Sequence, residues 1–387
     1  WLKLRGSRAS WCHAAECPKM TVQVRVAPGG LIHTGGSVVD TASDATVQDT
    51  PRGLCFPSLV LAGHGEAVCS AVWSPDGCKV VTASQDGTAK VWDAQTGLCV
   101  QTLRGHEGPV LSVAVSPQSC KVATSSSDRT ARIWDMETGG CDRILEAHGG
   151  PVCAVHFSPS GSEVLTASSD RTARLWNLEG QVLQKFAGHT QALHSAIFSP
   201  DGRQVLTASH DKTSRLWDLS GKLKQVFEGH SAHVYKAVFS ADGTKVMSCS
   251  ADDTGRIFDA TTGGCLSILT GHASAVYTAV FTPDGQQVLT GSADTHVGLF
   301  DVATGQLLRL FSDHQMAVHT VAFSGDGSQI LTAGDDRSVR IFDFASGTCL
   351  RCFEGHGDHV YAACFSPSSK QVLTASEDAT AKIFDIA

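Results

Sequence analysis

The stretch Gly188–Asp218, GHTQALHSAIFSPDGRQVLTASHDKTSRLWD, decides the fold because its spacing recurs through the chain. It begins with a Gly-His pair, carries an Asp 22 residues after that His, and ends on a Trp-Asp pair. Short apolar or alternating segments lie between turns such as Ser199–Gly202, where Pro fixes φ and Gly accepts positive φ. This pattern predicts short strands joined by hairpins rather than helices.

Eight copies of this pattern follow one another from residue 58 at a spacing of about 42 residues. The repeat histidines are His64, His106, His148, His189, His230, His272, His314 and His356. The aspartates 22 residues later are Asp86, Asp128, Asp170, Asp211, Asp252, Asp294, Asp336 and Asp378. The aromatic residues six positions after each Asp are Trp92, Trp134, Trp176, Trp217, Phe258, Phe300, Phe342 and Phe384. A Thr or Ser also stands four residues before each Asp.

Each repeat has room for four strands, and a four-stranded sheet at this spacing is typical of a propeller blade. We therefore expect an all-β chain with a single eight-bladed β-propeller over residues 57–387, built from four antiparallel strands per blade. The last repeat ends at its third strand, near Phe384, whereas Ser58–Ala62 is an additional outer-strand segment at the start. We expect this N-terminal outer strand to complete the eighth blade and remove the open sheet edges. A seven-bladed ring with one irregular repeat is the alternative.

Residues 1–56 are predicted to be an N-terminal tail or linker, largely disordered. The chain starts at Trp1 and its first Met is Met20, so residues 1–19 are interpreted as upstream sequence or a fragment boundary rather than native coding sequence. No part of 1–19 has the apolar core of a signal peptide.

The composition argues against several classes of function. The net charge of −8 argues against a nucleic-acid partner, which favours a basic face. No apolar run reaches the roughly 18 residues of a membrane span, so no membrane insertion is expected. The 14 cysteines recur in turns and apolar strands and are interpreted as free thiols in the cytoplasm, with the nucleus or cilium as alternatives. Cys12, Cys17 and His13 are too few and too irregular for a zinc site.

The His, the Asp that follows it and the Trp-Asp pair resemble the WD-repeat family, over about residues 57–387. This resemblance implies that His, Asp, hydroxyl and Trp form a hydrogen-bonded network inside each blade, where stranding one buried partner costs about 1–3 kcal/mol. Blades five to eight carry Phe in place of Trp and should lack the indole donor. Such sets imitate a catalytic triad, but eight identical copies favour a structural role. We expect no catalytic residue, no metal, no cofactor and no enzyme activity.

The resemblance also places residues three and five positions after each repeat His, and one before each repeat Asp, on one face of the ring. None of these 24 positions is Arg or Lys, which argues against phosphopeptide and nucleic-acid binding there. All three tyrosines of the chain fall among them. Clustered aromatic side chains are typical interface anchors. The predicted partner-binding residues are His194, His210, His233, Tyr235, Tyr277, His319, Asp335, His359, Tyr361 and Glu377.

A non-catalytic scaffold or adaptor that docks other proteins on a monomeric propeller is therefore the predicted function. A substrate receptor of a ubiquitin ligase is a weaker alternative. It needs an F-box or an Arg two residues after a Trp-Asp pair, where Gln95, Glu137, Glu179 and Ser220 stand instead. A propeller enzyme is a further alternative. The Thr-Ala-Lys/Arg strands are similar to those of dynein assembly factors with WD repeats, which implies a role in assembling or transporting a complex such as axonemal dynein.

Overall fold

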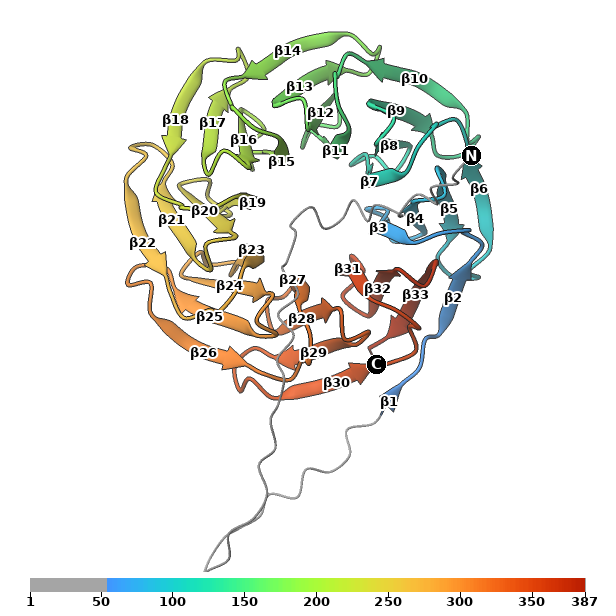
Figure 1. Ribbon diagram of the computed structural model, residues 1–387. Coiled ribbons are helices and arrows are strands. Elements are labelled where there is room, and N and C mark those ends of the chain that lie inside the picture. The colour runs from blue at the N-terminus through green and yellow to red at the C-terminus, as the bar shows by residue number, and fades with distance from the viewer. Residues whose placement is uncertain (1–53, 387) are drawn as a thin grey trace, which may run out of the picture. The chain divides into compact units, whose positions relative to one another are not determined.

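A computed structural model describes residues 54–386, and each repeat in this range supplies one antiparallel sheet of a closed ring (Figure 1). The eight sheets confirm the eight-bladed propeller, and the seven-bladed alternative is wrong. The predicted tail falls mostly on residues 1–53, which lie outside the described range. Within the predicted tail, Leu54–Cys55 form a short strand, β1.

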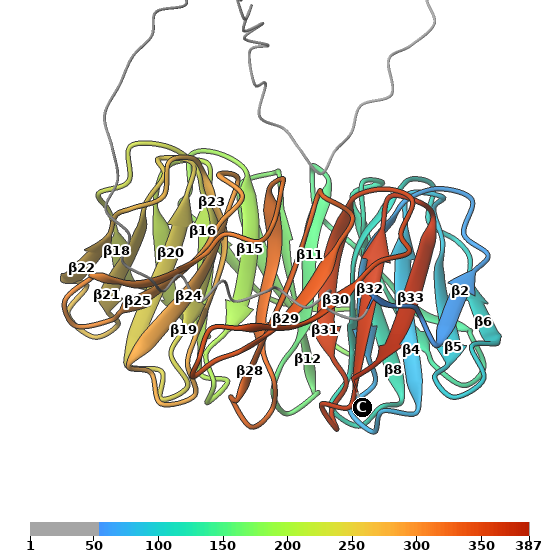
Figure 2. The same cartoon turned by 90° about the horizontal axis from the view of Figure 1, so that it is seen from below.

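Each blade contains four strands placed side by side from the central channel to the rim, and in blades one to seven these four follow one another in the chain. Figure 2 shows the ring from its edge. The innermost strands are β3 (Val68–Trp73), β7 (Val110–Val115), β11 (Val152–Phe157), β15 (Leu193–Phe198), β19 (Val234–Phe239), β23 (Val276–Phe281), β27 (Val318–Phe323) and β31 (Val360–Phe365). The second strands are β4 (Lys79–Ser84), β8 (Lys121–Ser126), β12 (Glu163–Ser168), β16 (Gln204–Ser209), β20 (Lys245–Ser250), β24 (Gln287–Ser292), β28 (Gln329–Gly334) and β32 (Gln371–Ser376).

The outer half of each blade carries the Trp or Phe of the repeat and then the rim. The third strands are β5 (Ala89–Asp93), β9 (Thr130–Asp135), β13 (Thr172–Asn177), β17 (Ser214–Asp218), β21 (Gly255–Asp259), β25 (Val297–Asp301), β29 (Val339–Asp343) and β33 (Thr380–Asp385). The rim strands are β6 (Cys99–Leu103), β10 (Cys141–Glu146), β14 (Val182–Ala187), β18 (Leu223–Phe227), β22 (Cys265–Leu269), β26 (Leu307–Phe311), β30 (Cys349–Phe353) and β2 (Leu59–Ala62).

The core lies between neighbouring blades. The second strands are buried along almost their whole length, whereas a rim strand such as β18 is exposed or half-buried except at its last residue, Phe227. This difference follows from their place, because a second strand is covered on both faces and a rim strand on one. Between blades four and five, for example, Leu206 and Phe227 pack against Val246 and Phe258. Full burial of each such side chain stabilises the ring by about 1.5–3 kcal/mol.

The ring closes as the sequence predicts. Strand β2 pairs antiparallel with β33, with Leu59 opposite Ile383 and Ala62 opposite Thr380. Leu61 of β2 is fully buried in the cluster that joins blades eight and one. The first and last strands of the ring therefore share one sheet, so blade eight has no open edge on its β33 side.

One element of the ring was not predicted. Strand β1 pairs in parallel with β30 and adds a fifth strand to the rim of blade seven, with Leu54 opposite Cys352 and Cys55 opposite Phe353. A two-residue strand carries no hydrophobic alternation for sequence analysis to detect. Its pairing is made possible by the open edge of the rim strand.

Candidate functional site

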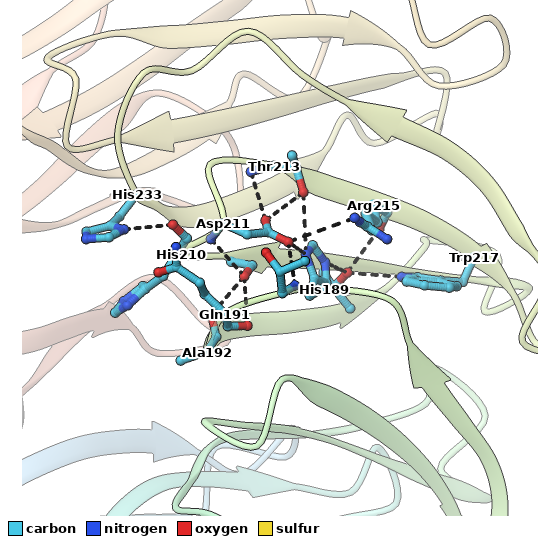
Figure 3. Close-up of polar contacts among 12 residues, drawn as sticks. His189, Gln191, Ala192, His210, Asp211, Thr213, Arg215, Trp217 and His233 are labelled. Atoms are coloured by element: carbon cyan, nitrogen blue, oxygen red, sulfur yellow. Dashed lines mark hydrogen bonds and ion pairs between the residues drawn. The ribbon is translucent and has the colours of Figure 1, made fainter.

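Inside every blade the repeat His joins the repeat Asp to a hydroxyl on the second strand. The His Nδ1 lies 2.7–2.9 Å from an Asp carboxylate oxygen in all eight blades. The His Nε2 lies 2.7–2.8 Å from the Thr or Ser hydroxyl. Figure 3 shows this network in blade four, where His189 lies between Asp211 and the hydroxyl bonded by Trp217.

The direction of these bonds follows from the donors available. In blades one to four the indole N–H of Trp donates to the Thr oxygen at 2.8–3.0 Å. The Thr O–H is then left to donate to His Nε2, and the His Nδ1–H donates to Asp. Blades five to eight have Phe, so this indole donor is missing there, as the sequence predicts, while the His bonds are retained.

Burial and hydrogen bonds fix the charge states of the network. Burial lowers the pKa of His64, His189, His230 and His356 by more than the nearby Asp raises it, which favours the neutral imidazole. Burial by itself would raise the pKa of Asp252. Hydrogen bonds from Thr254, the Ser231 N–H and His230 outweigh this effect and lower that pKa to about 2.

The network cannot act on a substrate from within the blades. The side chains of the eight repeat histidines are 0–2% exposed. A general base must come within hydrogen-bond reach of the proton that it removes. These imidazoles instead fasten the loop before the innermost strand to the turn between the second and third strands, which fixes the shape of the face above them.

A bulge at the start of each innermost strand presents one side chain to this face. In blade five, Val234 pairs with Ser250 and Lys236 with Cys249, so Tyr235 is the extra, unpaired residue. A bulge of this kind re-aims a side chain out of the regular alternation. The same register shift occurs in all eight blades, and at this position four neighbouring blades hold His194, Tyr235, Tyr277 and His319. Blade eight holds Tyr361 there.

These side chains form a continuous row of rings that we call the aromatic arc, consisting of His194, His210, His233, Tyr235, Tyr277, His319 and Tyr361. The ring centroids of Tyr235 lie 5.4 Å from those of both His194 and Tyr277. The Tyr277 and His319 rings are stacked at 5.3 Å, and the His319 and Tyr361 rings are 6.3 Å apart. His210 lies 4.3 Å from His194 and 4.4 Å from His233. The arc spans blades four to eight, and each member is half-buried.

The arc ends at a group of carboxylates between blades seven and eight. Asp335 Oδ1 accepts a hydrogen bond from His319 Nε2 at 2.8 Å and lies 2.7 Å from His359 Nδ1. Burial opposes ionisation of Asp335, but its contacts with the two histidines outweigh burial and lower its pKa. The Tyr361 hydroxyl donates to Glu377 at 2.7 Å. The structure thus brings all ten predicted partner-binding residues into one series of contacts.

Sequence analysis missed two features of the central channel. Lys236 is the sole Lys, Arg, Asp or Glu in the eight innermost strands described, and its ammonium donates to Thr278 at 3.1 Å. Its enclosure lowers the pKa of this ammonium. At the ends of the innermost strands, away from the aromatic arc at their starts, a cavity of about 640 Å³ is lined by Phe157, Phe198, Phe239 and Phe281. These phenylalanines end consecutive innermost strands, and this periodicity in the sequence could have identified them.

The chain forms a ring of four-stranded blades, and every blade contains one His–Asp network. These two features define a β-propeller built from sequence repeats. The family described as WD domain, G-beta repeat matches the chain at residues 55–93, 97–135, 139–177, 180–218, 221–259, 263–301, 305–343 and 347–385. The chain therefore belongs to the WD-repeat family.

Individual relatives are similar over short segments. Periodic tryptophan protein 2 of Saccharomyces cerevisiae is 52% identical over 40 residues, which cover 10% of this chain and 4% of the relative. The COMPASS component SWD1 of the same yeast is 42% identical over 84 residues, or 21% of this chain and 19% of the relative. The matched segments thus span less than a fifth of either relative.

Among solved structures, the computationally designed Ika8 protein superimposes with a TM-score of 0.77 and 29% sequence identity, over 85% of this chain and 99% of Ika8. The relatives and the fold fit a scaffold or adaptor role of the WD-repeat kind. No helix long and apolar enough to cross a membrane occurs in residues 54–386.

Proposed function

We propose that this chain is a non-catalytic scaffold that docks a partner protein on the face carrying the aromatic arc. The observation that carries this proposal is the unbroken row of ring contacts from His194 to Tyr361 across five blades. Rings bury a large area with few rotatable bonds, and a rigid, pre-formed face loses little conformational entropy when a partner binds. Because the network fixes the loops inside each blade and the apolar clusters fix neighbouring blades against each other, the docking surface needs no rearrangement.

The chemistry of the face favours a neutral or basic partner segment with apolar or aromatic side chains. Its 24 family-defined positions include no Arg or Lys, and Asp335 and Glu377 lie at one end of the arc. A phosphorylated segment would find no guanidinium to pair with its phosphate and would be repelled by these carboxylates. The partner is accordingly expected to be a protein and not a nucleic acid.

The test is a double substitution, Tyr235→Ala with Tyr361→Ala. Each ring is half-buried at the face rather than in the core between blades, so the variant should fold. Affinity purification from cells that express the protein should recover a defined set of partners with the wild type and lose at least one of them with the variant. The lost partner, once purified, should bind the wild type at least tenfold more tightly than the variant.

A matched control lies on the rim. Leu223→Ala with Leu308→Ala removes two exposed apolar side chains, from β18 and β26, without touching the arc. This control should retain every partner that the tyrosine variant loses. Normal capture by the tyrosine variant, or loss in the rim variant alone, would show that the arc is not the docking surface.

The pathway is a finer proposal. The resemblance of the strands to dynein assembly factors supports a role of this scaffold in assembling or transporting a complex such as axonemal dynein. The propeller would act as a monomer in the cytoplasm, with the nucleus or cilium as alternative places. Dynein subunits should then be among the proteins that the wild type recovers and the tyrosine variant loses. Their absence from a purification that yields other partners would reject this pathway but not the scaffold role.

A further inference from the structure

We propose that Asp358, His359 and Glu377 form a binding site for a divalent transition-metal ion of the Zn²⁺ type on the face of blade eight. Each residue offers one ligand atom, and the three atoms lie within 4.8 Å of one another. All three side chains are at least partly accessible, so an ion can reach them from solvent. His359 and Glu377 also belong to the docking face proposed above, but binding of the ion is measured without any partner protein, so the two proposals can fail separately.

The imidazole of His359 is oriented for metal binding. Its Nδ1 lies 2.7 Å from Asp335 Oδ1, so the proton is drawn to Nδ1 and the lone pair of Nε2 points away from Asp335. Metal-binding histidines commonly donate their second N–H to a carboxylate in this way, which fixes both tautomer and ring orientation. Asp335 would thus act as a positioning residue, and it is itself held by His319.

The distance between the Nε2 atom of His359 and the Asp358 carboxylate fits two ligands of one ion better than a direct hydrogen bond. His359 Nε2 lies 3.5 Å from Asp358 Oδ1, beyond the usual range of a hydrogen bond. Zinc bonds of about 2.0–2.2 Å to nitrogen and oxygen place two tetrahedral ligands roughly 3.3–3.5 Å apart. The Asp358 carboxylate is held in position because its Oδ1 also accepts the backbone N–H of His359 at 2.9 Å. A cation held by both atoms would interact favourably with the Asp358 carboxylate and with the lone pair of His359 Nε2.

The negative charge around His359 also favours binding of a cation. Asp335, Asp358 and Glu377 place three carboxylates around this imidazole, and within residues 54–386 none of them pairs with a Lys or Arg. Imidazole among the ligands favours zinc over calcium or magnesium, which prefer oxygen alone. Three protein ligands leave a fourth position for water or for a donor atom of a bound protein.

Blade five supplies a matched comparison. His233 occupies the position of His359 in the repeat, but Ala232 and Ala251 stand where blade eight has Asp358 and Glu377. His233 Nδ1 lies 2.8 Å from the carbonyl oxygen of His210. The two blades therefore present the same imidazole with and without the carboxylates, and only blade eight should bind the ion.

The experiment is a titration of the full chain with Co²⁺, as a spectroscopic substitute for Zn²⁺, followed by competition with Zn²⁺ under reducing conditions. The wild type should bind one equivalent with visible d–d absorption and without the thiolate charge-transfer bands that binding to exposed cysteines such as Cys99 would give. His359→Gln and Asp358→Asn should each weaken binding at this site by tenfold or more. Asp335→Asn should weaken it by about 10- to 100-fold.

His233→Gln is the control and should bind the ion as the wild type does. Thermal unfolding without metal checks that all variants fold, and added Zn²⁺ should raise the melting temperature of the wild type and of His233→Gln but not of His359→Gln. Three results would overturn the proposal: no binding by the wild type, equal binding by His359→Gln, or thiolate bands accounting for all of the bound metal.

Discussion

The substitution His230→Ala tests whether each repeat histidine stabilises its own blade. His230 bonds Asp252 at 2.9 Å and the Ser248 hydroxyl at 2.7 Å, and both His230 and Ser248 are buried. Asp252 keeps its bonds from the Ser231 N–H and from Thr254, so it is not stranded. The Ser248 hydroxyl loses its imidazole partner. A stranded hydroxyl costs about 1–3 kcal/mol and a lost bond to a charged group about 1.5–3 kcal/mol, which together predict a destabilisation of about 2.5–6 kcal/mol.

The assay is thermal unfolding followed by circular dichroism, with differential scanning calorimetry for the enthalpy. An unfolding entropy of about 2 cal/mol/K per residue over roughly 330 residues converts this loss into a fall in melting temperature of about 4–9 °C. The control Lys224→Ala, at an exposed position of β18, should leave the melting temperature within about 1 °C. An unchanged melting temperature for His230→Ala would refute the structural role of the network, because a histidine that serves only a surface site can be removed without this cost.

Three further predictions concern stability. Leu61→Ala should lower the free energy of unfolding by about 2–5 kcal/mol, because Leu61 is fully buried where β2 closes the ring. Val60→Ala, on the exposed side of β2, should lower it little. Equal urea midpoints for the two variants would contradict closure by β2. Lys212→Gly should raise the melting temperature slightly, because Lys212 has a φ of 72°, a left-handed conformation that strains residues other than Gly. Blade one has Gly87 at this position, with a φ of 80°. A lower melting temperature would show that contacts of the lysine side chain stabilise the protein by more than the strain costs. Stability to urea should fall on acidification, first below about pH 6.5 and again below about pH 3.8. The pKa values of His230 and Asp252 are lowered by folding, so the unfolded chain binds more protons than the folded one in both ranges. A stability that stays constant from pH 7 to 5 would count against neutral, buried histidines.

Most of the fold could be predicted because its determinants are local and repeated. The spacing of His189, Thr207, Asp211 and Trp217 recurs in phase, so each copy supports the interpretation of the others. The extra strand Ser58–Ala62 and the missing strand after Phe384 predict ring closure by simple complementarity. The parallel pairing of β1 with β30 could not be predicted, because residues almost 300 positions apart meet there through backbone bonds that impose no side-chain pattern.

The candidate site was predicted only as a set of positions. The family resemblance placed Tyr235, Tyr277 and His319 on one face, but the bulge that turns each side chain out of its strand is a feature of backbone pairing. The stacking of Tyr277 on His319 likewise depends on the angle between neighbouring blades. No sequence pattern contains that angle.

The sequence by itself predicted eight repeats and the order of their strands, because these follow from turns and spacings within about 42 residues. The network inside each blade was implied by the resemblance to the WD-repeat family, and the structure decided between eight blades and seven. The tertiary structure decided which residues of different blades touch. Asp335 contacts both His319 and His359, and Lys236 of one innermost strand contacts Thr278 of the next. The physical reason is that side chains on neighbouring blades meet only once interblade packing has fixed the curvature of the ring, and that curvature is a sum over all eight cores.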